Sequence, residues 1–347
     1  MKRELRLLLL GNGNVARAFL PLLASRSAWM EQELDSRPLI CGIGSRRSGF
    51  FVHPTGIAAK SFSSQADSLQ LLSPDGKSCD DARSFIQAGH AAGADVLIEL
   101  TTMNPADGEP ALTHIRLALE AGMDAITANK GPIAHAGRIL HTLARQQGVQ
   151  LRYESAVMDG LPLINLAEFT LPAVGIRGFR GLLNATSGIV LGKVEQGQSL
   201  EEAIQVAQQL GVAEANPWYD LDGWDATLKT TILANTWLNA HLNPRQIERT
   251  GIRDLSQAEI VAAVQAGTPI RLVSTARIID GVPSGTVRPE RLQHGDPLSC
   301  GKDLGMITLE TEAMGAVTLI EHGTGVLQTA YGVLSDLIVI LRTEQRT

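Results

Sequence analysis

The sequence predicts an α/β protein in which a Rossmann-type, doubly wound parallel sheet precedes a second, α+β domain. Strand-like and helix-like segments alternate over the first ~150 residues, as they do in doubly wound sheets. The first of these strands ends in a glycine-rich loop that opens a helix. From Leu151 onward the regular alternation stops, which indicates a separate domain of different architecture.

Length and composition agree with two globular domains. The chain has 347 residues, of which 44% are hydrophobic and 19% charged, and this length is sufficient to bury two cores. The net charge is −6 and the basic residues form no clustered stripe. A nucleic-acid-binding surface is therefore not expected.

The first domain is expected to begin with a buried strand, because residues 5–10 are continuously apolar and end at Gly11. Residues 111–121 have helical spacing and are closed by Gly122. The other elements expected here are a helix over residues 15–23, strands over 38–43, 94–99 and 124–127, and a polar loop over 73–83.

The second domain is expected to combine strands with separate helices. Ser199 and Glu202 form a capping-box pattern that predicts a helix over residues 199–210. Apolar residues at helical spacing predict a last helix over residues 329–340. The strands expected in this domain cover residues 151–156, 177–183, 271–279, 285–287 and 306–312.

Neither a membrane protein nor a structural metal site is expected. The N-terminal apolar run is too short for a signal peptide, and no segment approaches the ~20 apolar residues of a membrane span. The eight histidines and the three cysteines, Cys41, Cys79 and Cys300, show no metal-ligand spacing. Reduced thiols in the cytoplasm are therefore the expected state.

The loop after the first strand fits the pattern G-x-G-x-x-G/A of dinucleotide-binding proteins. Gly11 permits a tight turn, Gly13 lets the backbone approach a pyrophosphate, and Ala16 allows the helix to pack closely on the strand. The helix N-terminus then offers N–H groups to the anion. Thr101 and Thr102 follow another predicted strand and are expected to line the nicotinamide pocket. The loop residues expected to contact the coenzyme are Gly11, Asn12, Gly13, Asn14 and Val15.

The end of the second strand predicts a preference for NADP. NAD-binding proteins usually place Asp or Glu there to bind the ribose 2′-hydroxyl, whereas this chain has Ser45, Arg46 and Arg47. A guanidinium can pair bidentately with a 2′-phosphate. The alternatives are an ordinary solvated basic turn and NAD as the coenzyme.

Residues 214–229, which read EANPWYDLDGWDATLK, concentrate four acids and one lysine in a short segment. Asp225 and Lys229 are four residues apart, so they share one face of a helix. The acids before them lie in a predicted loop and can converge on one small polar molecule. Together with the nucleotide loop, this predicts a nicotinamide enzyme that acts on a charged amino acid. The alternative is an exposed ion pair worth only about 0.3–0.5 kcal/mol.

Six segments together resemble the homoserine dehydrogenases, in the short, monofunctional form without a regulatory domain. They are GNGNVA (11–16), ITANKGP (126–132), YESAVMDGLPLINL (153–166), GLLNATSGIVL (181–191), the acidic segment and TAYGVLSDL (329–337). The resemblance implies hydride transfer between a nicotinamide and the C4 carbonyl of L-aspartate 4-semialdehyde, which gives L-homoserine in threonine, methionine and isoleucine biosynthesis. It also implies a homodimer. We assign the coenzyme domain to residues 1–135 plus 318–347, and the catalytic and dimerisation domain to residues 136–317.

The resemblance also implies roles for individual residues. Lys229 is the first candidate to polarise the carbonyl and pass it a proton, and Asp225 would hold the lysine ammonium in place. Lys130 matches a second active-site lysine that binds the substrate carboxylate, shares the proton transfer or contacts the coenzyme. Gly325 belongs to a returning loop that touches the coenzyme. The residues expected to bind the substrate are Glu214, Asp220, Asn184 and Thr186.

A monovalent cation such as Na⁺ is a further implication, because Glu154 matches a glutamate that holds one together with backbone carbonyls such as that of Val157. Hard cations favour such oxygen ligands. The alternative is a strand-end glutamate that pairs with a basic residue. Asp159 is expected only to begin a turn.

Two other functions stay open at this point. Asn216 and Ala185 stand where the family commonly has aspartate and glycine, so the substrate could be a different amino-acid semialdehyde or 2-amino acid. A non-catalytic NADP-binding sensor is the other alternative, although the joint presence of Lys130, Glu214, Asp225 and Lys229 argues against it.

Overall fold

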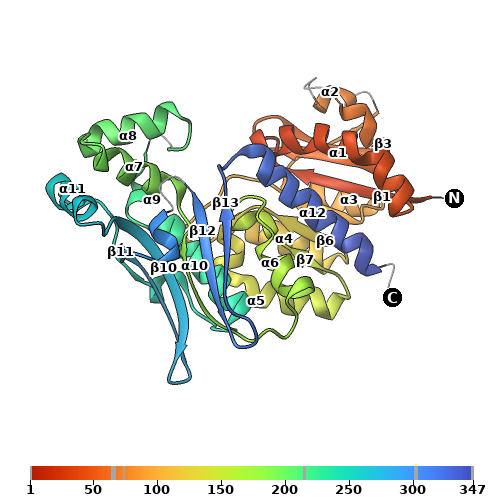
Figure 1. The fold of residues 1–347 in the computed structure, drawn as a ribbon. Helices are drawn as coiled ribbons and strands as arrows, with labels where there is room; N and C mark the ends of the chain where they lie inside the picture. The colour runs from red at the N-terminus through yellow and green to blue at the C-terminus, as the bar shows by residue number, and fades with distance from the viewer. Residues whose placement is uncertain (1, 64–67, 73–74, 214–215, 301–303, 345–347) are drawn as a thin grey trace. The chain divides into compact units, whose positions relative to one another are not determined.

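The computed structural model describes residues 2–63, 68–72, 75–213, 216–300 and 304–344 (Figure 1). The chain divides into two compact units. The first unit consists of Met1–Ile164 and Gly325–Thr347, and the second of Asn165–Thr324.

The first unit reaches further along the chain than residue 135, where the sequence placed its boundary. Helix α5 (Lys130–Gln147) packs on α4 (Ala111–Glu120), and strand β7 (Leu151–Arg152) pairs in parallel with β6 (Asp124–Thr127). Because β7 extends the same sheet, the polypeptide leaves the first unit only after Ile164.

A seven-stranded sheet forms the centre of the first unit, in the order β4-β3-β2-β1-β5-β6-β7. The five strands β2, β1, β5, β6 and β7 are parallel to one another, which confirms the expected Rossmann-type sheet. The strands not yet delimited are β1 (Arg3–Leu10), β2 (Ser36–Ser45), β3 (Gly49–Ala58), β4 (Lys77–Cys79) and β5 (Val96–Glu99).

Strands β3 and β4 were not predicted, and they make one edge of the sheet antiparallel. Pro54 and Gly56 interrupt the apolar pattern of β3, which is why the sequence did not indicate a strand there. β4 pairs with β3 only at residues 50–52, so Pro54 lies where no ladder partner needs its missing N–H. The predicted polar loop over residues 73–83 was wrong in part, because β4 and the start of α3 (Ala82–Ala91) fall within it.

Alternate side chains of β1 enter two different cores, one on each face of the sheet. Leu5, Leu7 and Leu9 pack in a cluster with residues of α1 (Asn14–Glu33) and α12 (Val326–Glu344). Leu8 and Leu10 pack with residues of α3 and α4. This two-sided burial explains why β1 reads as a continuous apolar run.

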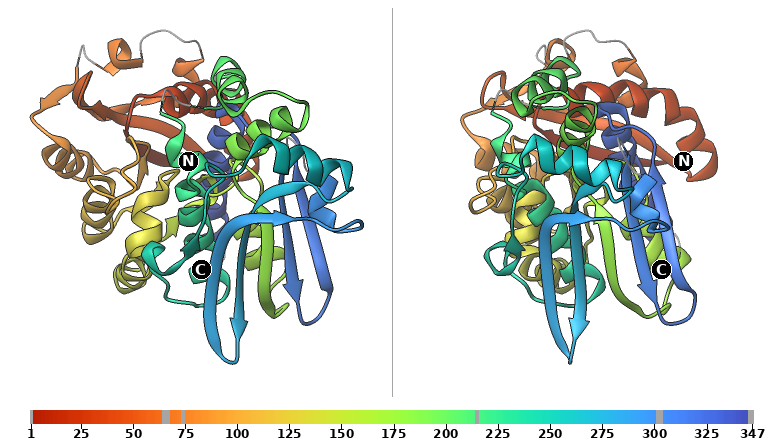
Figure 2. Two further views of the ribbon diagram at one scale, coloured as in Figure 1. Left: turned by 90° about the vertical axis from the view of Figure 1, so that its left-hand side faces the viewer. Right: turned by 60° about the vertical axis from the view of Figure 1, so that its left-hand side comes forward.

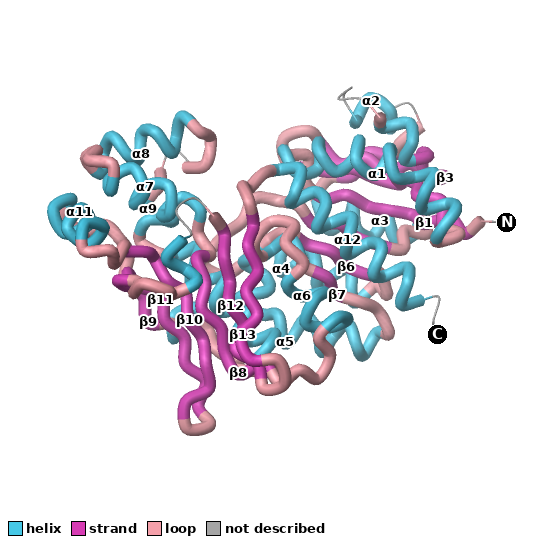
Figure 3. The backbone as a smooth tube through the Cα atoms, viewed as in Figure 1, coloured by secondary structure: helices cyan, strands magenta, loops and turns pink. Residues whose placement is uncertain are grey.

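Helices therefore cover both faces of the parallel sheet, and Figure 3 shows them in cyan against the magenta strands. Short elements complete the first unit. They are α2 (Ser68–Leu72), α6 (Leu163–Asn165) and the 3₁₀ turns Ala59–Phe62 and Glu154–Ala156.

Helix α12 is longer at both ends than the predicted helix over residues 329–340. Among the described residues it is the one helix long and apolar enough to cross a membrane by length and composition. Its side chains Val333, Leu337 and Ile340 are fully buried in the cluster shared with α1. The helix thus has the packing of a core helix in a globular unit.

The second unit contains a six-stranded sheet in the order β13-β12-β8-β10-β11-β9. Neighbouring strands are antiparallel, apart from the parallel pair β11 and β9. Figure 2 shows that the turns of the hairpins β10–β11 and β12–β13 lie at the same end of this sheet. The strands are β8 (Ile176–Leu182), β9 (Glu248–Arg249), β10 (Ile270–Ile279), β11 (Val282–Arg291), β12 (Gly305–Thr311) and β13 (Gly315–Glu321).

The helices of the second unit pack on one another and on this sheet. The predicted capping box is confirmed, because Ser199 Oγ accepts from Glu202 N at 3.2 Å and Glu202 Oε2 accepts from Ser199 N at 2.8 Å. The helices are α7 (Ala185–Glu195), α8 (Leu200–Gln209), α9 (Trp218–Leu221), α10 (Trp224–Trp237) and α11 (Gln257–Gln265). Shorter turns are Leu166–Thr170, Pro244–Gln246 and Pro297–Cys300.

Leu337→Ala is expected to lower the free energy of unfolding by about 2–5 kcal/mol, because it leaves a cavity in the core beneath α12. Ile139→Ala on α5 is the matched control, since Ile139 is 70% exposed and its truncation removes little buried surface. Urea unfolding followed by circular dichroism measures both. Equal stability of the two variants would show that α12 does not pack as described.

Candidate functional site

The glycine loop of the first unit needs its first glycine for steric reasons. Gly11 has φ +118°, and a Cβ on this residue would lie 2.4 Å from the carbonyl oxygen of Leu100. Its N–H donates to the Gly44 carbonyl at 2.8 Å. The loop is therefore fixed against the ends of β5 and β2, at the carboxyl edge of the parallel sheet, where open α/β sheets bind ligands.

The start of α1 has the features of an anion-binding helix terminus. Gly13 occupies the N-cap position and supplies no side-chain cap, and nothing lies within 4 Å of where its Cβ would be. Ala16 is fully buried, as close packing of helix and strand requires. Asn12 Oδ1 is buried and has no hydrogen-bond partner among the described residues. This geometry leaves room for a pyrophosphate beside the α1 N–H groups.

The turn between β2 and β3 presents two arginines at the end of β2. Arg46 and Arg47 are exposed, and the hydroxyl of Ser45 accepts from the backbone N–H of Ser48 at 3.2 Å. Residues 45–48 include no acid. The turn therefore offers cations, and no carboxylate, to a group bound there.

The loops after β5 and β6 contact each other. Asn129 caps α5 by accepting from Gly131 N at 3.1 Å, and its Nδ2 donates to the Thr101 carbonyl at 3.4 Å. Lys130 is the first residue of α5, and Thr102 is exposed. The structure thus brings the expected nicotinamide loop and the expected second lysine into adjacent segments.

The loop around Gly325 is held by Asp159, which was expected from the sequence only to begin a turn. Asp159 accepts from Gly325 N at 3.0 Å and from the hydroxyl of Thr329 at 3.3 Å. Asp159 itself has a positive φ of 49°. It therefore anchors the segment that returns to the first unit.

Glu154 and Val157 lie in a buried turn of the first unit. Glu154 is 1% exposed, its Oε1 accepts from Ile164 N at 2.8 Å, and its N–H donates to Asp336 Oδ2 at 2.8 Å. Among the described residues no group of three or more His, Cys, Asp or Glu side chains could hold a metal ion. The monovalent cation stays a prediction.

The two cysteines with described side chains, Cys41 and Cys79, form no disulfide. Cys41 is buried, and burial raises the pKa of its thiol to about 12. Cys79 is unpaired and lies in β4. The Cys300 side chain lies outside the described part of the structure.

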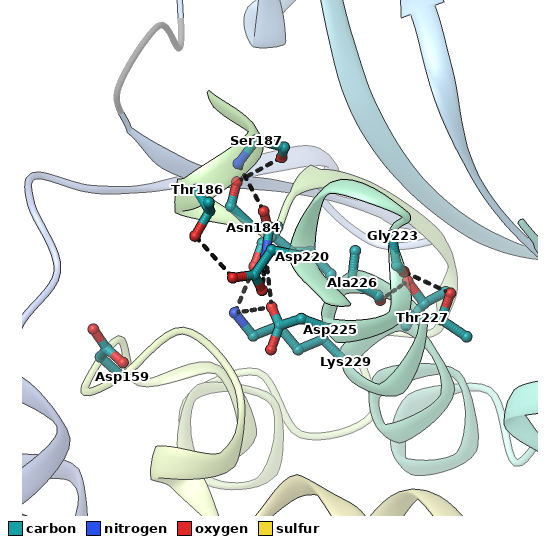
Figure 4. A network of polar contacts seen from close by, with 12 residues as sticks. Asp159, Asn184, Thr186, Ser187, Asp220, Gly223, Asp225, Ala226, Thr227 and Lys229 are labelled. Carbon is teal, nitrogen blue, oxygen red and sulfur yellow. Dashed lines mark hydrogen bonds and ion pairs between the residues drawn. The ribbon is translucent and has the colours of Figure 1, made fainter. Parts of the chain in front are cut away.

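The centre of the polar cluster in the second unit is an ion pair. Lys229 Nζ lies 3.0 Å from Asp225 Oδ2, and the two side chains are only 14% and 10% exposed. Nζ also donates to the Leu183 carbonyl at 2.6 Å. Figure 4 shows this ion pair. Its low exposure means that the alternative of an exposed surface ion pair is wrong.

Asn184 joins this ion pair to a second acid. Its Oδ1 accepts from Ser187 N at 2.8 Å as the N-cap of α7, which directs the amide NH₂ to the opposite side. Nδ2 then donates to Asp220 Oδ1 at 2.9 Å and to Asp225 Oδ2 at 3.1 Å. Thr186 Oγ1 donates to the other oxygen of Asp220 at 3.0 Å. Figure 4 shows these contacts converging from the starts of α7 and α10 and from α9.

Glu214 and Asn216 precede this cluster in the acidic segment. Glu214, the expected ligand of the substrate amino group, lies outside the described residues. Asn216 Oδ1 accepts from Trp218 N, the first residue of the short helix α9, at 3.3 Å.

Burial has the largest effect on the pKa of Asp220. It raises the pKa of Asp220 above its ordinary value, and the neighbouring Asp225 carboxylate raises it further, while Asn184, Thr186 and Lys229 oppose the shift. Burial likewise raises the pKa of Tyr219, with smaller contributions from Asp225 and Asp220. The hydroxyl of Tyr219 has no hydrogen-bond partner among the described residues.

Two arginines that the sequence did not single out hold the turn between the acids. Arg253 pairs with both oxygens of Asp222, at 2.9 and 2.7 Å, and its guanidinium lies 3.9 Å above the Trp218 ring. Arg249 donates to the Asp222 carbonyl and stacks on Trp224. These contacts could not be predicted from spacing, because the arginines are more than 20 residues from Asp222 in the sequence. The presence of both arginines and tryptophans is only a weak signal for such stacking.

The fold and these residues define the class of protein. A Rossmann-type unit with a glycine loop at the carboxyl edge of its sheet, and a second unit with a buried acid–lysine cluster, have the organisation of a nicotinamide-dependent oxidoreductase.

Comparison with known proteins identifies the family. The family profile described as Homoserine dehydrogenase matches residues 162–338. The chain is 37% identical to the NAD(+)-dependent homoserine dehydrogenase of Pseudomonas canavaninivorans over 99% of this chain and 98% of that protein. It is 34% identical to the homoserine dehydrogenase of Methanocaldococcus jannaschii over 73% of this chain and 74% of that one.

Solved structures agree with this relation. The homoserine dehydrogenase of Thermoplasma acidophilum aligns with a TM-score of 0.81 and 25% identity, covering 98% of this chain and all of that one. A hyperthermophilic archaeal homoserine dehydrogenase mutant in complex with NADPH aligns with a TM-score of 0.80 and 26% identity, covering 98% of each chain. The chain belongs to the homoserine dehydrogenase family and is an oxidoreductase.

Asp220 is expected to titrate at a pH above the ordinary aspartate pKa of about 3.9. Its folded-state pKa is raised, so the folded state binds more protons than the unfolded one, and Asp220 reduces stability as pH rises through that interval. Carbon-13 NMR of the carboxyl group measures the titration. Asp225→Asn should lower this pKa and Lys229→Met should raise it. An Asp220 pKa at or below the ordinary value in the unmodified protein would contradict the described environment.

Proposed function

We propose that the chain catalyses the NAD(P)-dependent interconversion of L-homoserine and L-aspartate 4-semialdehyde. The proposal is carried by the buried Asp225–Lys229 pair in a chain that is related to this family along nearly its whole length. The coenzyme supplies or accepts the hydride. In this proposal the first unit binds the coenzyme, and the second unit binds and polarises the amino-acid substrate.

Lys229 is the group that we assign to the reacting oxygen. Hydride addition to a carbonyl carbon leaves negative charge on the oxygen, and an ammonium held away from bulk water stabilises that charge strongly. Asp225 and the Leu183 carbonyl fix the position of Nζ. Lys229 then passes a proton to the alkoxide, and it takes the proton back when L-homoserine is oxidised.

Asp225 has a second source of stability besides Lys229. It lies in the first turn of α10, which begins after Gly223 in the left-handed conformation, and a helix N-terminus favours a carboxylate there. A carboxylate held in this way keeps Lys229 charged, because a nearby opposite charge favours the ionised form.

Asp220 is assigned to the α-ammonium group of the substrate, together with Glu214. Asn184 and Thr186 occupy one position on each oxygen of Asp220 and fix the carboxylate plane. An incoming ammonium would lower the raised pKa of Asp220 and so favour its ionised form. Substrate binding and deprotonation of Asp220 are therefore coupled.

Lys130 is the lysine of the first unit to which we assign a role in the reaction. As the first residue of α5, it follows the carboxyl end of β6, the edge at which open α/β sheets bind ligands. Its ammonium can bind the substrate carboxylate or take part in proton transfer.

Lys229→Ala and Lys130→Ala are each expected to lower kcat for L-homoserine oxidation by about 10²-fold or more, because each removes a positive charge from the reacting groups. The absorbance of the reduced coenzyme measures turnover. Lys60→Ala is the matched control, since Lys60 is exposed in the turn Ala59–Phe62. Near-normal turnover of either variant would remove that lysine from the mechanism.

We also propose that NADP is the preferred coenzyme. The support is the pair of exposed arginines after β2 and the lack of an acid in that turn. Named relatives include both an NAD(+)-dependent protein and a mutant solved with NADPH, so the arginines are the feature that favours one coenzyme here.

The double variant Arg46→Ala/Arg47→Ala is expected to lower kcat/KM for NADP⁺ by about tenfold or more and to leave that for NAD⁺ nearly unchanged, because charge-assisted hydrogen bonds to the 2′-phosphate are lost. Arg26→Ala on α1, also exposed, is the control for loss of surface charge. A tenfold preference of the unmodified protein for NAD⁺ would overturn the assignment.

A further inference from the structure

A buried carboxylate in the first unit contacts both the loop after β5 and the last residue of β6. Glu99, the last residue of β5, is 0% exposed. Its Oε1 accepts from Thr101 N at 2.9 Å and from the Thr101 hydroxyl. Its Oε2 accepts from the Thr127 hydroxyl at 3.0 Å. One carboxylate oxygen therefore holds Thr101 in the loop after β5, and the other holds Thr127, the last residue of β6.

The contacts close into a ring that includes the cap of α5. Thr127 Oγ1 accepts from Asn129 N at 3.0 Å, and Asn129 Nδ2 donates to the Thr101 carbonyl at 3.4 Å. Thr101 in turn donates to Glu99. We call Glu99, Thr101, Thr127 and Asn129 the Glu99 ring.

The directions of the hydrogen bonds in the Glu99 ring require both carboxylate oxygens of Glu99 to act as acceptors. The Thr127 hydroxyl already accepts from Asn129 N, so its proton needs Glu99 Oε2. Thr101 presents two further donors to Oε1. An ionised carboxylate only accepts hydrogen bonds and therefore satisfies all three donors. In a glutamine at this position, the side-chain NH₂ group would face one of these donors, and that hydrogen bond would be lost.

His114 is the ionisable neighbour of the carboxylate. Its Nδ1 lies 3.8 Å from Glu99 Oε1, which is beyond hydrogen-bond length. Nδ1 is buried and has no hydrogen-bond partner among the described residues. The described hydrogen bonds to Glu99 thus come from the loop after β5 and from the end of β6, and not from α4.

We propose that Glu99 is a positioning residue that sets the placement of the nicotinamide-binding loop at Thr101 and Thr102 relative to Lys130. The ring connects the loop that follows β5 to the first turn of α5, where Lys130 lies. A loop positioned to about half an ångström is needed for hydride transfer. The inference rests on the proposed function in so far as the first unit binds the coenzyme.

The test compares two ligands that differ in the nicotinamide half. Thr127→Val removes the hydroxyl but keeps the branched shape, Thr127→Ser keeps the hydroxyl, and Glu99→Gln keeps the size of the carboxylate. Isothermal titration calorimetry measures the Kd of NADPH and of 2′,5′-ADP, which carries only the adenosine half. NADH and ADP replace this pair if the chain prefers NAD.

Thr127→Val and Glu99→Gln are expected to weaken binding of the whole coenzyme by about tenfold and to leave the fragment unaffected. The reason is that a loop no longer held by the ring must be ordered when the nicotinamide half binds, which costs binding free energy. Thr127→Ser should bind both ligands like the unmodified chain. Ser27→Ala is the matched control, since Ser27 loses only a buried bond of 2.9 Å to the Leu23 carbonyl of its own helix.

Equal weakening of the whole coenzyme and the fragment would overturn the proposal, because it would mean that the ring only stabilises the unit. Unchanged binding of the whole coenzyme by Thr127→Val would overturn it as well. If Glu99→Gln does not fold, Thr127→Val decides. The ratio of the two Kd values is measured without turnover. If the chain binds NADPH but does not oxidise L-homoserine, the proposed function is rejected, and the proposal about Glu99 can still be tested by binding.

Discussion

Burial of the Lys229 ammonium and the Asp225 carboxylate is the constraint on which the polar cluster of the second unit depends. A buried ion without partners costs several kcal/mol, so the fold must bring compensating groups to both charges. The Leu183 carbonyl serves Lys229 and the Asn184 amide serves Asp225. Because Asn184 also caps α7, the end of β8, the start of α7 and the first turn of α10 are fixed by one set of contacts. The fold and the site therefore share these contacts.

Much of this cluster could be predicted from the sequence, because helical spacing alone places Asp225 and Lys229 on one face. Family motifs added Asn184 and Thr186, which the structure brings into direct contact with Asp220 and Asp225. The Leu183 carbonyl could not be predicted, since a backbone acceptor has no side-chain signature. The contact of Arg253 with Asp222 depends on the tertiary path of the chain after β9. Residue spacing in the sequence carries no information about that path.

The same distinction separates the strands that were predicted from those that were not. β1, β5 and β6 are buried on both faces, and their apolar runs are readable in sequence. β13 is an edge strand whose residues are mostly exposed, so it has little apolar pattern to detect. β3 contains a proline and is paired on both sides over only a few residues. In both strands the backbone ladder, rather than side-chain burial, defines the element.

The chain's path has a consequence for biosynthesis. The first unit is interrupted after Ile164 and resumes only at Gly325, and α12 contributes six fully or almost fully buried side chains to the core beneath β1. During translation that core stays open to solvent until the entire inserted segment has been made and α12 has left the ribosome. Nascent chains of this length can aggregate while apolar surface is uncovered. The inserted unit can complete its own sheet before its host does.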